Sequence, residues 1–161
     1  MKRDALTAVR SLVWPVCLIG AKQNEKHNVM TAAWVTQVSA DPLLVLVSIA
    51  PGRYTHDLIA RTGEFVVSIL GRGQENISSF CGSRSGRDVD KIAHLKLPTI
   101  PSEVVQVPRL AGCIANLECK VVAQYPAGDH TLFVGEVVAA DVSKEEAAPL
   151  LMYRSKTGIF K

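Results

Sequence analysis

The sequence predicts a mainly β protein, folded as a closed or partly closed antiparallel barrel with short helices on its connections. Three observations favour this fold. Roughly six or seven segments have strand-like patterns, the helical segments are short, and the two kinds do not alternate as they would in a doubly wound parallel sheet. Closure would remove the exposed edges of apolar strands. The length of 161 residues suits one domain, covering residues 1–161.

The composition is that of a folded protein, with 48% hydrophobic and 20% charged residues. The net charge is +3 without a Lys/Arg cluster, so we expect no nucleic-acid partner. No apolar stretch approaches the length of a membrane span. The apolar N-terminal segment is interrupted by Pro15 and preceded by Asp4, which argues against a signal peptide and for a cytoplasmic protein.

The four cysteines are far apart and form no C-x-x-C pair. We therefore expect free, mostly buried thiols, as in a cytosolic protein. A zinc site needs Cys and His ligands at short spacing, so no metal site is predicted.

The first strand is predicted over residues 16–22, and a continuous strand over residues 28–42 follows a polar turn. This second strand has no polar face, because one side would carry Met30, Ala32, Trp34, Thr36 and Val38 and the other Val29, Thr31, Ala33, Val35 and Gln37. A third, almost continuously apolar strand follows over residues 43–50. Asp41 is the one charged residue between positions 29 and 52, which predicts that both strands are buried on both faces, by the core on one side and by something else on the other.

A short helix is predicted from about Thr55 to Arg61 and closed by Gly63. The strand over residues 64–70 alternates, with Phe65, Val67 and Ile69 on one face and Glu64 and Ser68 on the other. A second helix is predicted over residues 74–80, before a loop over residues 81–93.

The Pro-rich residues 97–112 are predicted to be extended and partly irregular. Two long alternating strands follow over residues 114–124 and 130–142, joined by the turn YPAGD. A short helix over SKEEAAP (143–149) and an extended tail end the chain.

Two segments could bind an anion. The turn and helix start in GRYTHDL present Arg53 and Thr55, although Thr55 could be an ordinary helix N-cap and Arg53 a solvated charge. The loop SGRDVDKI offers Ser85 and Lys91, although charged loops are commonly just solvated. His130 could contact a ligand at the mouth of the barrel or cap a turn.

Common enzyme signatures are missing. The segment GRGQEN lacks the third glycine of a dinucleotide fingerprint and precedes no βαβ unit. There is no phosphate-binding Walker sequence and no G-x-S-x-G nucleophile elbow. Trp34 and Phe160 would by default be packing aromatics.

Seven segments nevertheless occur in a recognisable order: NVMTAAW (28–34), SADPL (39–43), RYTHDLI (53–59), TGEFVVS (62–68), SGRDVDK (85–91), GDHTLFVGEV (128–137) and YRSKTGIF (153–160). Together they resemble the flavin reductase-like, FMN-binding split-barrel family, and its flavoredoxin branch in particular. The resemblance runs from about Val9 to Phe160, nearly the whole chain.

The resemblance implies a Greek-key split β-barrel that forms a homodimer with FMN near the interface. It implies a flavin site lined by Asn28, Thr31, Ala32, Ala33, Trp34 and Ser48, with His130 and Phe160 beside the ring. Arg53, Thr55 and Lys91 would bind the ribityl phosphate. Four residues of the neighbouring loop are weaker candidates for the same site: Ser83, Arg84, Ser85 and Arg87.

The implied function is an NAD(P)H:flavin oxidoreductase, in which hydride passes from NADH or NADPH to FMN. Because the flavin carries the redox chemistry, no catalytic side chain is required, and His130 is the one candidate. The reduced flavin could serve a monooxygenase or another acceptor protein. The alternative is a flavoredoxin-like electron-transfer protein, or a flavin-binding module, with little turnover of its own.

Overall fold

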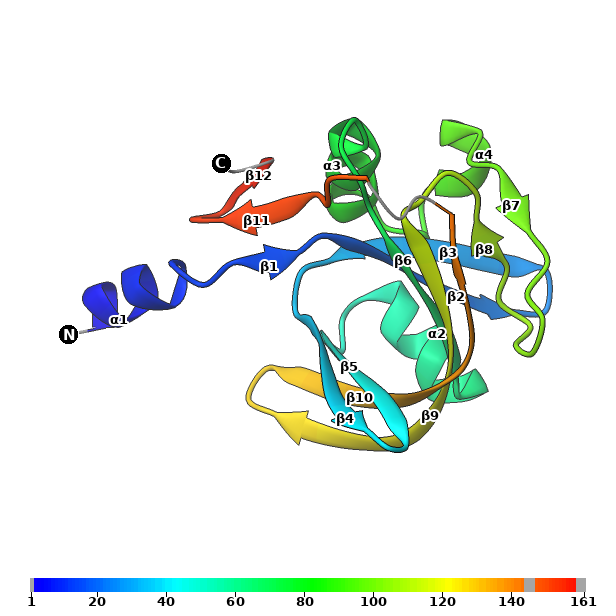
Figure 1. The fold of residues 1–161 in the computed structure, drawn as a ribbon, viewed down its shortest axis with the longest axis horizontal. Helices are drawn as coiled ribbons and strands as arrows, with labels where there is room; N and C mark the ends of the chain where they lie inside the picture. Colours follow the sequence, from blue (N-terminus) through cyan, green and yellow to red (C-terminus); the bar gives the residue numbers. More distant parts are fainter. Residues whose placement is uncertain (1, 144–146, 159–161) are drawn as a thin grey trace.

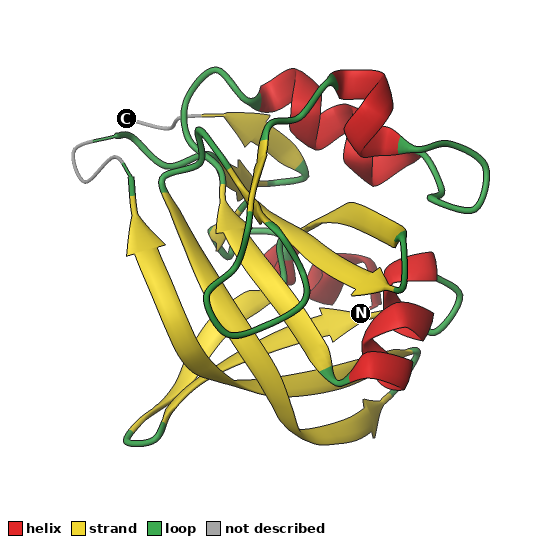
Figure 2. Ribbon diagram, turned by 90° about the vertical axis from the view of Figure 1, so that its right-hand side faces the viewer, coloured by secondary structure: helices red, strands yellow, loops and turns green. Residues whose placement is uncertain are grey.

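The computed structural model describes residues 2–143 and 147–158. Its main feature is a seven-stranded, fully antiparallel sheet in the order β3-β2-β6-β9-β10-β5-β4 (Figures 1 and 2). The strands are β2 (Cys17–Gln23), β3 (Lys26–Ala32), β4 (Val35–Ala40), β5 (Leu43–Ile49), β6 (Glu64–Ile69), β9 (Ala115–Ala127) and β10 (His130–Val142). The predicted mainly β fold is confirmed.

The sheet curls so that its two edge strands approach each other at one end. β3 and β4 are at opposite edges of the strand order, yet only Ala33 and Trp34 separate them along the chain. Within the described residues no ladder pairs β3 with β4, so the barrel is split there rather than closed. The prediction of one continuous strand over residues 28–42 was therefore wrong. The backbone turns at this point, where Val35 N–H donates to Ala33 O and Ser48 N–H to Trp34 O.

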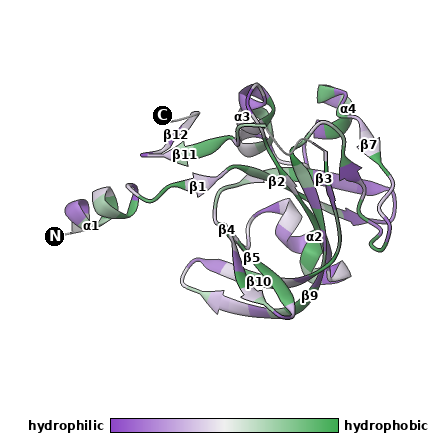
Figure 3. Ribbon diagram, viewed as in Figure 1, coloured by the Kyte–Doolittle hydropathy of each residue, from purple (hydrophilic) through white to green (hydrophobic). Residues whose placement is uncertain are grey.

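Helix α2 (Tyr54–Thr62) lies inside the curl of the sheet (Figure 1). As predicted it ends at Gly63, whose φ of 70° is the left-handed conformation that glycine adopts readily. Its Leu58 and Ile59 pack with Phe65 and Phe133 in the largest hydrophobic cluster. Figure 3 shows the hydrophobic stretches along the strands around it.

Helices α3 (Glu75–Ser83) and α4 (Lys91–Leu95) cover the other face of β2 and β3. A second cluster, which includes Leu18, Val29, Cys81 and Leu110, fills the space between them. β2 and β6 are therefore largely buried on both faces, and Ser68 on β6 is as buried as its apolar neighbours although it is polar. The predicted loop over residues 81–93 is also shorter, since α3 extends to Ser83 and α4 begins at Lys91.

The single chain by itself does not cover both faces of the edge strand β4, whose second face was expected to meet something other than the core. Trp34 and Val38 are each 48% exposed, and Leu43 at the start of β5 is 44% exposed. In the single chain, the uncharged residues around β4 therefore form an exposed apolar surface.

The remaining elements are small. They are α1 (Lys2–Val9), which the sequence did not predict, β1 (Trp14–Pro15), β11 (Leu151–Tyr153) and β12 (Lys156–Gly158) in one sheet, and β7 (Thr99–Ile100) with β8 (Arg109–Leu110) in another. The helix predicted over residues 143–149 falls partly outside the described residues, and Pro149 forms an isolated bridge with Gly71. None of the helices in the described ranges has the length and apolar character that a bilayer span requires.

Candidate functional site

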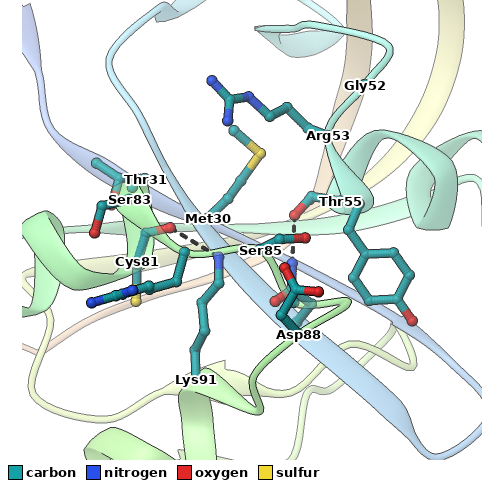
Figure 4. Close-up of a pocket in the computed structure, with 15 residues that line it drawn as sticks. Met30, Thr31, Gly52, Arg53, Thr55, Cys81, Ser83, Ser85, Asp88 and Lys91 are labelled. Atoms are coloured by element: carbon teal, nitrogen blue, oxygen red, sulfur yellow. Dashed lines mark hydrogen bonds between the residues drawn. The ribbon is translucent and has the colours of Figure 1, made fainter.

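Two adjoining cavities lie where β3, the start of α2 and the α3–α4 connection meet. The first has a volume of about 330 Å³ and is lined by polar residues of these three segments (Figure 4). The second, of about 270 Å³, continues along the turn between β3 and β4 to the start of β10. They adjoin each other, because Met30, Thr31 and Arg53 line both.

The first cavity is cationic. Arg53, Arg84 and Lys91 line it against one carboxylate, that of Asp88, and the hydroxyl groups of Ser83 and Ser85 add further hydrogen-bonding capacity. Arg53 stands at the N-cap position of α2 without a side-chain cap, so the helix start adds free N–H groups and a partial positive charge. A multiply charged oxyanion matches this set of donors.

Lys91 is 3% exposed, and its Nζ donates to Val29 O at 2.8 Å and to Cys81 O at 2.9 Å. Burial lowers the pKa of Lys91, the Cys81 thiol opposes that shift, and the nearby Arg53 adds to it. An ammonium group has three N–H bonds, so one donor remains beyond these two carbonyl groups. Figure 4 shows the side chain extending from α4 towards the cavity.

The wall of the first cavity is held by a buried contact between β3 and α2. Asn28 Nδ2 donates to Thr55 Oγ1 at 2.8 Å, and both side chains are almost fully buried. Gly86 packs directly against Asn28, because a Cβ built on it would lie 2.1 Å from Asn28 Oδ1. The hydroxyl of Thr55 therefore ties two elements together and does not cap α2.

Arg87 fixes the loop before α4 to α2. Its guanidinium donates to Gly52 O at 3.1 Å and to Asp57 Oδ2 at 2.6 Å, and it stacks over Tyr54 at 5.3 Å from the ring centre. Because these contacts use the guanidinium, Arg87 holds the loop in place and is not part of the cationic lining of the first cavity.

The second cavity is shaped by small and aromatic residues. Ala32 and Ala33 leave space beside the backbone, and Trp34 packs against His130 with ring centres 4.7 Å apart. His130 Nδ1 lies 2.6 Å from Asp129 Oδ1, and this hydrogen bond lowers the pKa of the Asp129 carboxyl. The carboxylate accepts, so Nδ1 carries a proton and Nε2 is left without a partner among the described residues.

The structure brings together the predicted site residues that it describes. Asn28, Thr55, Ser85 and Lys91 line the first cavity, Thr31 and Arg53 line both, and the second adds Ala32, Ala33, Trp34, Ser48 and His130. Phe160 lies outside the described residues. Of the weaker candidates, Ser83 and Arg84 line the first cavity and Arg87 does not.

Sequence reasoning missed Met30, Cys81 and Asp88 as lining residues. Asp88 lies in the segment SGRDVDK, but nothing about its position in this charged loop distinguished it from a solvated residue. Thr31 was expected at the flavin, and its hydroxyl donates to Ser78 O at 2.6 Å, so it also anchors α3.

Comparison with known proteins identifies the family, because residues 9–160 match the flavin reductase like domain. The chain belongs to the flavin reductase-like family. An NADH-dependent flavin reductase from a Rhodococcus species is 36% identical over 160 residues, covering 99% of this chain and 83% of the relative. An uncharacterised protein from Archaeoglobus fulgidus is 46% identical over 71% of this chain. The chain spans 64% of the length of that archaeal relative.

Solved structures of flavin proteins share the fold. The NADH:FAD oxidoreductase SgcE6 of Streptomyces globisporus matches with a TM-score of 0.89 at 26% identity, covering 99% of this chain and 93% of that one. Flavoredoxin from Methanosarcina acetivorans matches with a TM-score of 0.84 at 30% identity, covering 92% and 86%. The family match and these relatives support a flavin oxidoreductase.

Proposed function

We propose that this protein is an NAD(P)H:flavin oxidoreductase that holds FMN across the two adjoining cavities. The observation that carries the proposal is their adjacency: a cationic cavity shares Met30, Thr31 and Arg53 with a cavity shaped by alanines and two aromatic rings. FMN has the same division, with a phosphate at one end and a flat ring at the other.

The residues present fit this ligand. A phosphomonoester carries nearly two negative charges at neutral pH, which three cations and one carboxylate in the first cavity can balance. Ala32 and Ala33 leave clearance for a ring close to the backbone, and Ser48 lies on the neighbouring β5.

Bound flavin supplies the hydride-accepting chemistry, and the protein binds, orients and tunes it. The cationic cavity would hold the phosphate end, and the flat ring would then lie in the second cavity. His130 lines the second cavity and is held through Nδ1 by Asp129, so it is the candidate side chain for a proton transfer there. No nucleophile is needed, which agrees with the missing signatures in the sequence.

The alternative proposal is a flavoredoxin-like electron-transfer protein, favoured by the likeness to Methanosarcina acetivorans flavoredoxin. The two functions differ in turnover. Purified protein should therefore be examined for bound flavin by its absorption spectrum and then assayed for NADH and NADPH oxidation with and without added FMN. Flavin-dependent oxidation supports the oxidoreductase, FMN binding without turnover supports the carrier, and failure to bind FMN would refute both.

We also propose that the protein forms a homodimer through the face around β4. Trp34, Val38 and Leu43 are large exposed apolar residues in or next to β4, and Leu43 with Val35 lines an apolar groove of about 350 Å³. Monomeric proteins rarely expose contiguous apolar patches of this kind unless the patch is functional. Because Trp34 also lines the second cavity, the interface would lie beside the flavin ring.

Light scattering on the purified protein tests the dimer. Val38→Glu should give a monomer, because it would place a charge in the buried interface. Val122→Glu is the matched control, since Val122 is 52% exposed on β9 and does not line the groove. A monomeric wild-type protein would contradict the proposal.

We propose that the reduced flavin delivers its electrons to a monooxygenase. The flavin reductase of styrene monooxygenase from Pseudomonas putida S12 has a TM-score of 0.81 to this chain at 30% identity. A coupled assay with such an oxygenase component, scored by product formation, tests this step.

A further inference from the structure

A third cavity lies beyond the first. It has a volume of about 440 Å³, and it shares Asn28, Tyr54, Gly86 and Asp88 with the first cavity. The second cavity shares different residues with the first, namely Met30, Thr31 and Arg53, which Figure 4 labels in the lining of the first cavity. The first, cationic cavity therefore shares lining residues with each of the other two. It lies between the second cavity and this third cavity, which we call the outer cavity.

Asp88 stands at the junction between the cationic and outer cavities. Its backbone N–H donates to Ser85 O, and its carboxylate has no hydrogen-bond or ion-pair partner among the described residues. Figure 4 shows the side chain among the residues that line the cationic cavity, on the side of Thr55 and Ser85. Asp88 therefore lies at the boundary between the cationic cavity and the outer cavity.

The outer cavity offers little positive charge to offset Asp88. Its lining holds the carboxylates of Glu25, Asp88 and Asp90 against two cations, Lys26 and Arg87. Arg87 is already paired with Asp57 at 2.6 Å. Burial lowers the pKa of His27, which also lines the cavity, to about 4, so its imidazole is neutral at pH 7. The charge therefore changes from net positive to net negative across the junction.

We propose that Asp88 is a specificity-determining residue, which makes the site prefer a flavin that ends in a phosphomonoester, FMN, over one extended by a second phosphoryl group, FAD. The proposal rests on the proposed function. Both flavins would place their first phosphate among Arg53, Arg84 and Lys91, which line the cationic cavity. Only the dinucleotide carries a second negative phosphate past Asp88 into the outer cavity, where like charges repel.

Two variants test the proposal, each measured by titrating FMN and FAD separately against the apoprotein and following the quenching of flavin fluorescence. In the wild type the dissociation constant for FAD should exceed that for FMN. In Asp88→Asn the ratio of the two constants should fall about fivefold, since one like-charge contact specific to FAD is removed. In Asp88→Lys it should fall further, because the repulsion becomes an attraction.

Glu136→Gln is the control, since it removes one exposed negative charge on β10 that lines none of the three cavities. Its ratio should equal that of the wild type. An unchanged ratio in both Asp88 variants, or a wild type that binds FAD as tightly as FMN, would overturn the proposal while leaving the flavin function intact. Failure to bind either flavin would instead refute the proposed function.

Discussion

Replacing Gly86 with alanine tests how the loop before α4 shapes the cationic cavity. The new Cβ would lie 2.1 Å from Asn28 Oδ1, 2.5 Å from Asn28 Cγ and 2.8 Å from Tyr54 Cδ1. Ordinary van der Waals contact begins near 3.4 Å, so either the loop or the Asn28 side chain must move by more than 1 Å. Movement of Asn28 would break its 2.8 Å hydrogen bond to Thr55 Oγ1.

The expected cost follows from these contacts. Overpacking typically costs about 1–3 kcal/mol, and loss of a buried hydrogen bond adds about 1 kcal/mol. An outward shift of the loop relieves part of this strain, so we expect the free energy of unfolding to fall by about 1–3 kcal/mol. FMN affinity should fall by at least about tenfold, because the same shift moves Ser85 and the cavity wall.

Urea denaturation followed by circular dichroism measures the first quantity, and FMN fluorescence quenching measures the second. Gly52→Ala is the matched control, because Gly52 lines the same cavity and no atom lies within 4 Å of the position that its Cβ would occupy. Its unfolding free energy should match that of the wild type. A Gly86→Ala protein with wild-type stability and wild-type FMN affinity would refute the packing argument.

Three further changes have defined outcomes. Ala33→Leu should weaken FMN binding about tenfold or more with little change in stability, whereas Ala33→Ser should bind nearly as the wild type does; unchanged affinity of the leucine variant would contradict the ring placement. Lys91→Met should lower the unfolding free energy by about 1–3 kcal/mol, measured in urea, because it leaves the carbonyl groups of Val29 and Cys81 unpaired. The free energy of unfolding should also decrease by up to about 3 kcal/mol as the pH falls from 6.5 to 4. In this range His27 binds a proton in the unfolded protein, where its pKa is about 6.5, but not in the folded protein, where its pKa is about 4. His27→Gln should make the free energy of unfolding less dependent on pH between 6.5 and 4. If the variant shows the same pH dependence as the wild type, groups other than His27 cause it.

Much of the site could be predicted only because its segments resemble those of a family. Reasoning from the residues alone left Arg53 and Thr55 between an anion site and an ordinary helix start, and left His130 undecided. The resemblance grouped these residues, and the structure places them in the linings of two adjoining cavities. Asp88 escaped both kinds of reasoning, because a carboxylate in a charged loop becomes informative only when the neighbouring cations are known.

The sequence by itself determined the local structure. Alternation predicted β9 and β10, and Gly63 predicted the end of α2, since both signals depend on the conformations of residues close in the chain. Tertiary structure decided the turn after β3, the exposure of β4 and the contact of Asn28 with Thr55. These features depend on which strands become neighbours in the curled sheet, and local periodicity contains no information about contacts between residues so distant along the chain.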